Sequence, residues 1–123
     1  MILVDSSIWI DHLSNSDPVM TDLLQSGRVV GHPFVTGEIA LGNLRNPIAV
    51  IGTLRKLQQV TVADDEEVLA LIRRNSIGGA GIGYVDAHLL AAARLGDGIR
   101  LWTRDKRLRA VAERLDLSAN PLH

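Results

Sequence analysis

The chain has 123 residues with a formal net charge of −1, and 46% of them are hydrophobic, so we expect one domain with an ordinary apolar core. It contains no cysteine, which excludes disulfides, thiol nucleophiles and thiolate metal sites and leaves oxygen and histidine as metal ligands. The near-neutral charge argues against a general nucleic-acid coat protein, and no apolar stretch approaches the roughly 20 residues of a membrane span, so we expect a cytoplasmic protein.

The first residues predict a strand, a sharp turn and a helix. Residues 2–4 are a continuous aliphatic run, as in a parallel strand that is covered on both faces. Asp5 follows this strand, and Ser6 is expected to be the N-cap of a helix that carries Ile8 and Trp9 on its apolar face. Ligands of open α/β sheets bind outside the carboxyl ends of the strands, so Asp5 is either a candidate site residue or only a helix cap.

Strands and helices alternate along the rest of the chain. Apolar periodicity and end signals predict helices over residues 18–25, 34–44, 47–57, 65–74, 84–95 and 108–115, and strands over residues 29–30, 60–62 and 101–103. Asp64 and Glu67 match a capping box, residues 76–83 form a glycine-rich loop, and Leu117 is expected to begin a short final strand. The alternation predicts an α/β fold in which helices flank a mainly parallel central sheet.

Four carboxylates occur where a surface carboxylate is not expected. Asp5 and Asp105 each follow an apolar strand at its carboxyl end. Glu38 and Asp86 lie beside apolar stripes of their helices, because the residues three and four positions away are apolar or glycine and include no cation. An unpaired carboxylate in such a position carries a large free-energy cost or gives up its charge.

This acidic set most economically predicts a divalent cation with oxygen ligands, Mg²⁺ or Mn²⁺, that keeps water in part of its coordination shell. The alternative is that arginines from elsewhere in the fold neutralise the acids. The acidic run over residues 64–67 is different, because a capping box and the helix dipole already explain it as a solvated helix start.

Four segments of the chain carry a family resemblance. They are ILVDSSIWIDHL at the start, HPFVTGEIALGNL from His32, GIGYVDAHLLAAA from Gly81 and LWTRDKRL from Leu101. On these segments, the chain from Ile2 to Asn120 resembles the PIN-domain ribonucleases, and specifically the VapC-type toxins of bacterial toxin–antitoxin pairs. The positions that match the acidic quartet of the family are Asp5, Glu38, Asp86 and Asp105.

The resemblance implies a single PIN domain over residues 1–123 and a Mg²⁺- or Mn²⁺-dependent endoribonuclease. It also implies a small VapB-type antitoxin as inhibitor and a homodimer. The four acids would be catalytic and hold metal, with Asp105 acting directly, through a second ion or through water. Ser6 and Thr103 would support them, and Arg104 and Lys106 are the candidate RNA contacts.

The sequence also suggests other functions. A PIN-like domain whose acids hold a structural metal could bind a partner or nucleic acid without turnover. A phosphatase of the haloacid-dehalogenase type needs a second aspartate where Ser7 stands, and the glycines of residues 76–83 lack the lysine and the preceding strand of a phosphate loop. His12, His32, His88 and His123 lack zinc-site spacing, and the few aromatic residues do not indicate base stacking as a main recognition mode.

Overall fold

The computed structural model describes residues 1–121, so the end of the predicted domain, which includes His123, lies outside the described residues. A four-stranded sheet with the order β3-β2-β1-β4 forms the centre, and all of its paired strands are parallel. This confirms the predicted α/β class. The strands are β1 (Ile2–Val4), β2 (Val29–Gly31), β3 (Gln58–Gln59) and β4 (Arg100–Trp102), and the helices are α1 (Ser6–Ser14), α2 (Pro18–Gln25), α3 (Pro33–Ala40), α4 (Pro47–Lys56), α5 (Asp65–Arg74), α6 (Tyr84–Leu95) and α7 (Lys106–Arg114).

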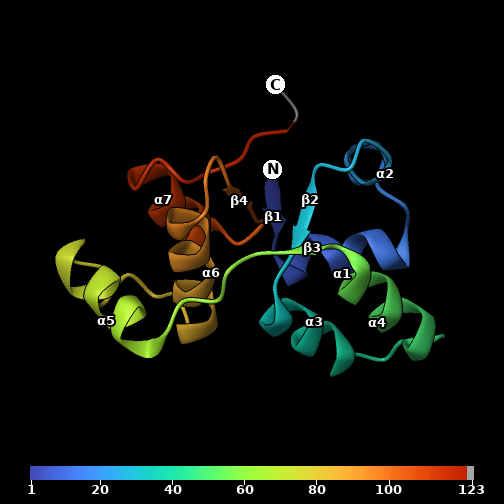
Figure 1. The fold of residues 1–123 in the computed structure, drawn as a ribbon, viewed down its shortest axis with the longest axis horizontal. Helices are drawn as coiled ribbons and strands as arrows, with labels where there is room; N and C mark the ends of the chain where they lie inside the picture. The colour runs from blue at the N-terminus through green and yellow to red at the C-terminus, as the bar shows by residue number, and fades with distance from the viewer. Residues whose placement is uncertain (122–123) are drawn as a thin grey trace.

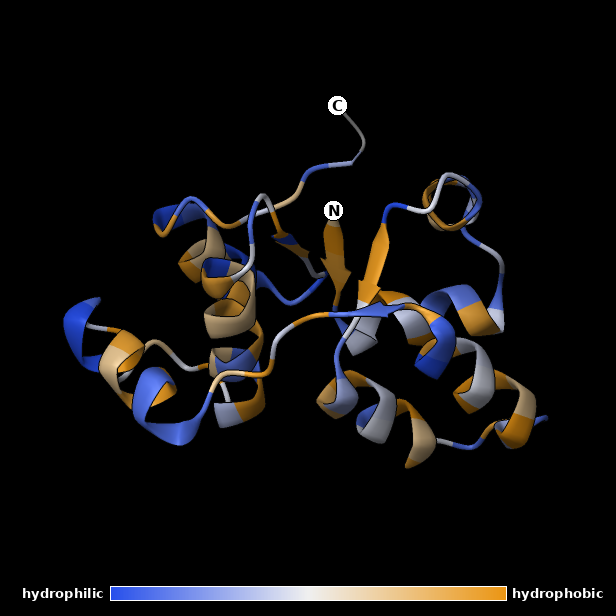
Figure 2. Ribbon diagram, in the orientation of Figure 1, coloured by the Kyte–Doolittle hydropathy of each residue, from blue (hydrophilic) through white to orange (hydrophobic). Residues whose placement is uncertain are grey.

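Strand β1 is the central element of the sheet. All three of its residues are buried, and it pairs with β2 on one side and with β4 on the other. Helices α5, α6 and α7 gather on the β4 side, and α1 to α4 lie on the β2 and β3 side (Figure 1). Figure 2 shows that β1 and β2 are hydrophobic where the two halves meet, as expected for parallel strands that are covered on both faces.

Helix α6 is the most deeply buried helix. The seven consecutive residues 87–93 are all buried, and four of them are alanines. The helix contacts α5 on one side and β4 on the other, so it has no broad solvent face. The small alanine side chains allow these close approaches. The acidic first turn and the basic last turn of α5 are exposed, and both ends of this helix are hydrophilic in Figure 2.

Because the strands are parallel, their carboxyl ends meet at one edge of the sheet. Asp5 follows β1, His32 follows β2, and Thr103 follows β4. Helices α1, α3 and α7 begin directly after these turns, so their N-termini share the same edge. The fold therefore brings segments that are about a hundred residues apart in the chain to one place, as the hydrogen bond from Asp5 N to the Trp102 carbonyl (2.9 Å) shows.

Some predicted boundaries are wrong. The strand predicted over residues 60–62 is instead the exposed pair Gln58–Gln59, and Val60 adds only one hydrogen bond, to the Gly31 carbonyl. The alternation of apolar and polar residues over 60–62 predicts a strand, but only Val60 is buried there, and Val62 is 41% exposed. The helix predicted over residues 34–44 ends at Ala40, where Gly42 N turns back to the Ile39 carbonyl.

Other predicted boundaries need only small changes. The strand predicted over residues 101–103 is shifted by one residue to β4. The final strand expected at Leu117 is reduced to a single parallel bridge between Leu101 and Ser118. Among residues 1–121, no helix combines the length and the apolar character that crossing a bilayer requires.

Leu3 tests the central role of β1. Its side chain is fully buried, so Leu3→Ala should leave a cavity and lower the free energy of unfolding by about 2–5 kcal/mol. The exposed Leu69 is the matched control, and Leu69→Ala should change stability by no more than about 0.5 kcal/mol. Urea denaturation of the two variants measures both values, and equal midpoints would contradict this account of the core.

Candidate functional site

Asp5 is the most buried acid of the quartet, with 5% of its surface exposed. Its Oδ1 accepts a hydrogen bond from Ser6 N (2.8 Å), and its Oδ2 accepts hydrogen bonds from Ser7 Oγ (3.0 Å) and Thr103 Oγ1 (2.7 Å). These donors therefore hold this carboxylate in one orientation. Both carboxylate oxygens of this buried group therefore have hydrogen-bond partners, as a buried polar group requires.

The predicted cap of α1 is wrong. Asp5 itself is the N-cap, and Ser6 is the first helical residue, whose amide and hydroxyl groups both face Asp5 Oδ1. Serine and aspartate are about equally favoured as N-caps, so two adjacent candidates cannot be separated from sequence. Ser6 still contacts Asp5, but as a donor to the cap.

Thr103 connects two of the predicted acids. Its buried hydroxyl donates to Asp5 Oδ2 and accepts a hydrogen bond from Asp105 N (3.0 Å). Asp105 in turn caps α7, because its Oδ1 accepts a hydrogen bond from Leu108 N (3.0 Å). Asp105 is an exposed residue. The end of β4 thus fixes Asp5 and the start of α7 through one side chain.

Ser7 belongs to the site, although the sequence did not point to it. Its hydroxyl donates to Asp5 Oδ2 and accepts a hydrogen bond from Arg104 N (3.2 Å). The available signal was a hydroxyl residue two positions after a strand-end aspartate, which can reach back to that carboxylate. From the sequence alone, the only inference drawn from Ser7 is that the chain lacks the second aspartate of a haloacid-dehalogenase-type phosphatase.

Glu38 and Asp86 approach Asp5 from α3 and α6. Burial raises the pKa of Glu38 above its ordinary value of 4.5, the charges of Asp5 and Asp86 raise it further, and the Ser6 side chain opposes the shift. Burial also raises the pKa of Asp86 above 3.8; a hydrogen bond from Gly83 N (3.0 Å) opposes this, and the charges of Asp5 and Asp105 add to it. Glu38 and Asp86 are therefore close enough to Asp5 and to each other to feel repulsion, and Asp86 also feels the charge of Asp105.

Glu38 is more exposed than its apolar neighbours in the sequence predict. Asp86 is half-buried, but Glu38 is an exposed residue of which only part is covered. The apolar neighbours of Glu38 misled the prediction, because Phe34 and Leu41 are themselves exposed, Leu41 to 90%. The helical spacing placed Glu38 on the face of α3 that is directed toward Asp5, but it did not predict how far the Glu38 side chain is buried.

No arginine or lysine neutralises the quartet within residues 1–121. The ion pairs there involve other acids, and Arg104 contacts Asp11 (2.7 Å) and Asp17 (3.0 Å). These contacts occupy the guanidinium of Arg104, which was a candidate RNA contact, whereas Lys106 is exposed beside Asp105. The alternative in which arginines neutralise the four acids has no support in this part of the chain.

The carboxylates of the quartet are candidate ligands for a metal ion. In the described chain, no three histidine, aspartate or glutamate side chains stand close enough to chelate an ion directly. Mutually repelling carboxylates that lack a basic partner suit a hard divalent cation, and Mg²⁺ usually keeps several waters. Asp5, Glu38 and Asp86 are therefore the residues that could hold such an ion, in part through water.

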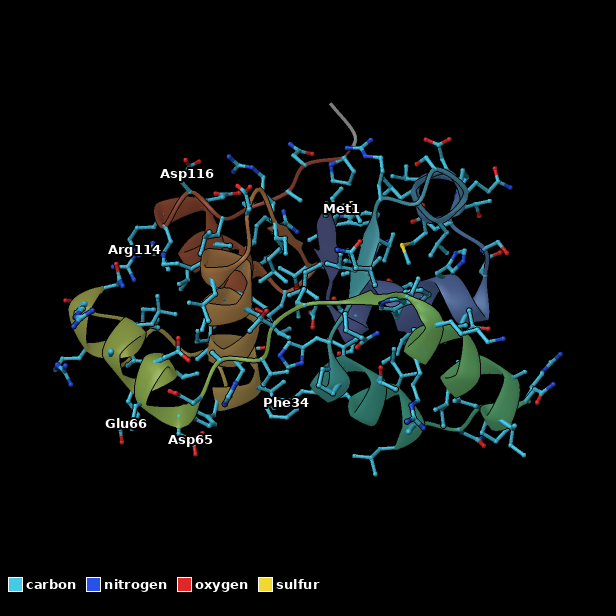
Figure 3. All side chains as sticks on the ribbon, in the orientation of Figure 1. Met1, Phe34, Asp65, Glu66, Arg114 and Asp116 are labelled. Carbon is cyan, nitrogen blue, oxygen red and sulfur yellow. The ribbon has the colours of Figure 1, made fainter. Side chains whose placement is uncertain are left out.

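A cluster of rings sets the position of α3 against α6. His32 is fully buried and caps α3 by accepting from Phe34 N at Nδ1 (3.0 Å), which agrees with its predicted role as a rigid corner. The Phe34 ring packs edge-on against His32 and His88, and Tyr84 packs on the other side of His88. Figure 3 shows Phe34 between the starts of the two helices that carry Glu38 and Asp86.

Burial, and then the nearby His88, lower the pKa of His32 to about 4. His32 is therefore neutral at physiological pH, as its acceptor role at Nδ1 requires. Within the ring cluster, His32 is thus a capping and packing residue rather than a source of positive charge for the acids.

The chain is similar to known proteins along most of its length. Residues 2–114 match the family model described as the PIN domain. Ribonuclease VapC32 of Mycobacterium tuberculosis, strain CDC 1551 / Oshkosh, is 46% identical over 111 residues, which cover 90% of this chain and 90% of that protein. The protein of the same name from strain H37Rv matches to the same extent. These findings confirm the resemblance described from the sequence.

The hydroxyl of Thr103 can be tested by an isosteric change. Thr103→Val leaves Asp105 N and Asp5 Oδ2 each short of a partner, so it should lower the free energy of unfolding by about 1–3 kcal/mol. Thr103→Ser keeps the hydroxyl and should cost less. If urea denaturation shows that the Thr103→Val variant is more stable than the Thr103→Ser variant, the connecting role of Thr103 is refuted.

Burial of Asp86, together with repulsion from Asp5 and Asp105, predicts an unusual pH dependence of stability. A carboxyl whose pKa is raised on folding adds stability below its ordinary pKa, 3.8 for Asp86, and this contribution is lost as pH rises through the raised value. In EDTA at neutral pH, Asp86→Asn should therefore be more stable than the wild type, and the gain should vanish on acidification. Thermal melts across pH measure the difference, with the exposed Asp97→Asn as control. Equal or lower stability of Asp86→Asn at neutral pH would count against a pKa of Asp86 that is raised by burial and repulsion.

Proposed function

The chain belongs to the PIN-domain family, and on that premise we propose that it is a divalent-metal-dependent endoribonuclease, the toxin of a toxin–antitoxin pair. The observation that carries this proposal is the buried Asp5 carboxylate, which repels Glu38 and Asp86 and has no basic partner within residues 1–121. The name and similarity of Ribonuclease VapC32 support RNA as the substrate.

Asp5, Glu38 and Asp86 are proposed as the residues that hold Mg²⁺ or Mn²⁺ or its waters, and Asp105 as a ligand through water or of a second ion. When bound, such an ion supplies an activated water and neutralises charge at a phosphodiester. Thr103 and Ser7 keep the Asp5 carboxylate oriented through their hydroxyl donors. The raised pKa of Glu38 allows its carboxyl group to accept a proton at a higher pH than an ordinary glutamate does.

Partners of the protein follow from the same family relationship. We propose inhibition by a small VapB-type antitoxin, which the similarity to Ribonuclease VapC32 supports. Assembly as a homodimer and a cytoplasmic location are further proposals that rest on the family resemblance alone. Lys106 is proposed as an RNA contact, because it is exposed directly after Asp105. Arg104 is a poorer candidate, because two aspartates already bind its guanidinium.

The catalytic assignment predicts the loss of metal-dependent cleavage in single variants. With total bacterial RNA and Mg²⁺ or Mn²⁺, Asp5→Asn and Asp86→Asn should each lower the cleavage rate by more than about 100-fold, beyond the loss typical of residues outside the ligand shell. The exposed Asp97→Asn removes one carboxylate elsewhere and should retain wild-type cleavage. Variants of Asp5 and Asp86 that cut RNA as well as the wild type would overturn the assignment.

A PIN-like module that binds without turnover is distinguished by its effect in cells. For the toxin, expression without antitoxin should arrest bacterial growth, and Glu38→Gln should abolish the arrest at equal protein level, because it removes one metal-holding charge. Growth curves and immunoblots measure both quantities. Arrest that persists with Glu38→Gln, together with unchanged RNA binding, would favour the non-catalytic module.

A further inference from the structure

A positively charged groove lies between α7 and the glycine-rich loop of residues 76–83. Its volume is about 550 Å³, and its lining includes the loop residues Gly78, Gly79 and Ala80 and the cations Lys106, Arg107 and Arg114. Arg114 lies at the carboxyl end of α7 (Figure 3). The three cations are therefore arranged along one helix, opposite a stretch of loop backbone.

The groove has three cations and no carboxylate in its lining. A second cavity, between α5 and α6, differs, because Arg74 and Arg94 there are accompanied by Glu66 and Glu67. Within residues 1–121, none of the three groove cations forms a salt bridge. Their charge is thus available to an anionic ligand, unlike that of Arg104.

The loop adds backbone donors to these cations. Gly78 and Gly79 are exposed, and in the described chain their amide groups donate no hydrogen bond to other protein atoms. Gly79 and Gly81 have φ angles of +82° and +81°, which glycine adopts readily. A Cβ atom on Gly81 would lie 2.9 Å from Cδ and Nη1 of Arg107, so the arginine side chain lies directly across the loop backbone.

Both walls of the groove lead into the acidic site. The loop ends at Gly83, whose amide donates to Asp86 Oδ2. Helix α7 begins immediately after Asp105, which caps it. A chain that occupied the groove would therefore continue toward the carboxylates of Asp86 and Asp105.

We propose that this groove binds the phosphodiester backbone of the RNA strand on one side of the cleavage site. The inference rests on the proposed function, and it assigns Arg107, Arg114 and the amides of Gly78 and Gly79 to phosphate binding, together with Lys106. Cations and backbone amides recognise phosphates without reading base edges, so the contribution is independent of sequence. Specificity for a particular RNA has to come from other parts of the protein.

The test measures RNA binding in EDTA, where no cleavage complicates it. The probe is a short, fluorescently labelled, single-stranded RNA of mixed sequence, and its affinity is measured over a range of salt concentrations. For the triple variant Lys106→Gln, Arg107→Gln and Arg114→Gln, the slope of log K against log salt should become shallower by about 2, since each lost phosphate contact on a single strand removes about 0.7.

The matched control removes three positive charges from the other side of the sheet. Arg45, Arg55 and Lys56 are exposed near or on α4, and the variant with glutamine at all three positions should keep the wild-type slope. Because Arg107 packs on the loop, the double variant Lys106→Gln and Arg114→Gln serves if the triple variant does not fold, with an expected change of about 1.4.

Equal slopes for the wild type and the groove variants, or an equal change in the control, would overturn the proposal. A groove variant that binds RNA normally but loses an acidic protein partner would also overturn it, in favour of a protein ligand. Binding in EDTA and cleavage with metal are separate readouts. A protein that shows the expected slopes but cuts no RNA would retain the groove and refute the proposed nuclease function.

Discussion

The hydrogen bonds to the Asp5 carboxylate are the interaction on which the rest of the site depends. They join the end of β1, the first turn of α1 and the end of β4 around one buried negative charge. Thr103 extends this network to Asp105 and therefore to the start of α7. The strands alone would bring these segments near one another, but the hydroxyl groups fix which atoms face the crevice.

A second constraint brings the helical acids to Asp5. The edge-on packing of Phe34 on His32 and His88 holds the start of α3 beside the start of α6. Glu38 lies one turn further along α3, and Asp86 lies in the first turn of α6. Apolar and aromatic packing thus provides the free energy that keeps mutually repelling carboxylates together, and a bound cation would remove the remaining repulsion.

The sequence was informative about elements with strong local signals. The ends of α2, α5 and α6 were predicted well, because proline and aspartate mark the start of α2, a capping box opens α5, and an alanine-rich apolar pattern defines α6. The four acids were singled out for a similar reason, since strand ends and apolar helix faces are unusual places for a carboxylate, and their role stays a prediction. The parallel topology then made their proximity a reasonable expectation.

The sequence was less informative where neighbours distant in the chain decide the outcome. Ser6 and Asp5 are comparable caps, and only the donors at Thr103 and Ser7 show why Asp5 takes the position. Arg104 appeared to be a free cation until the fold placed it between Asp11 and Asp17. Glu38 was expected to be covered, but its exposed neighbours on α3 leave it open to solvent.

The most direct measurement of the central claim is the position of Mn²⁺ in crystals of this protein, located by its anomalous scattering. Our account predicts one ion between Asp5 and Asp86, with Glu38 and Asp105 in contact with it directly or through water. An ion bound only elsewhere, or no ion at this edge of the sheet at saturating Mn²⁺, would contradict the assignment of the four carboxylates.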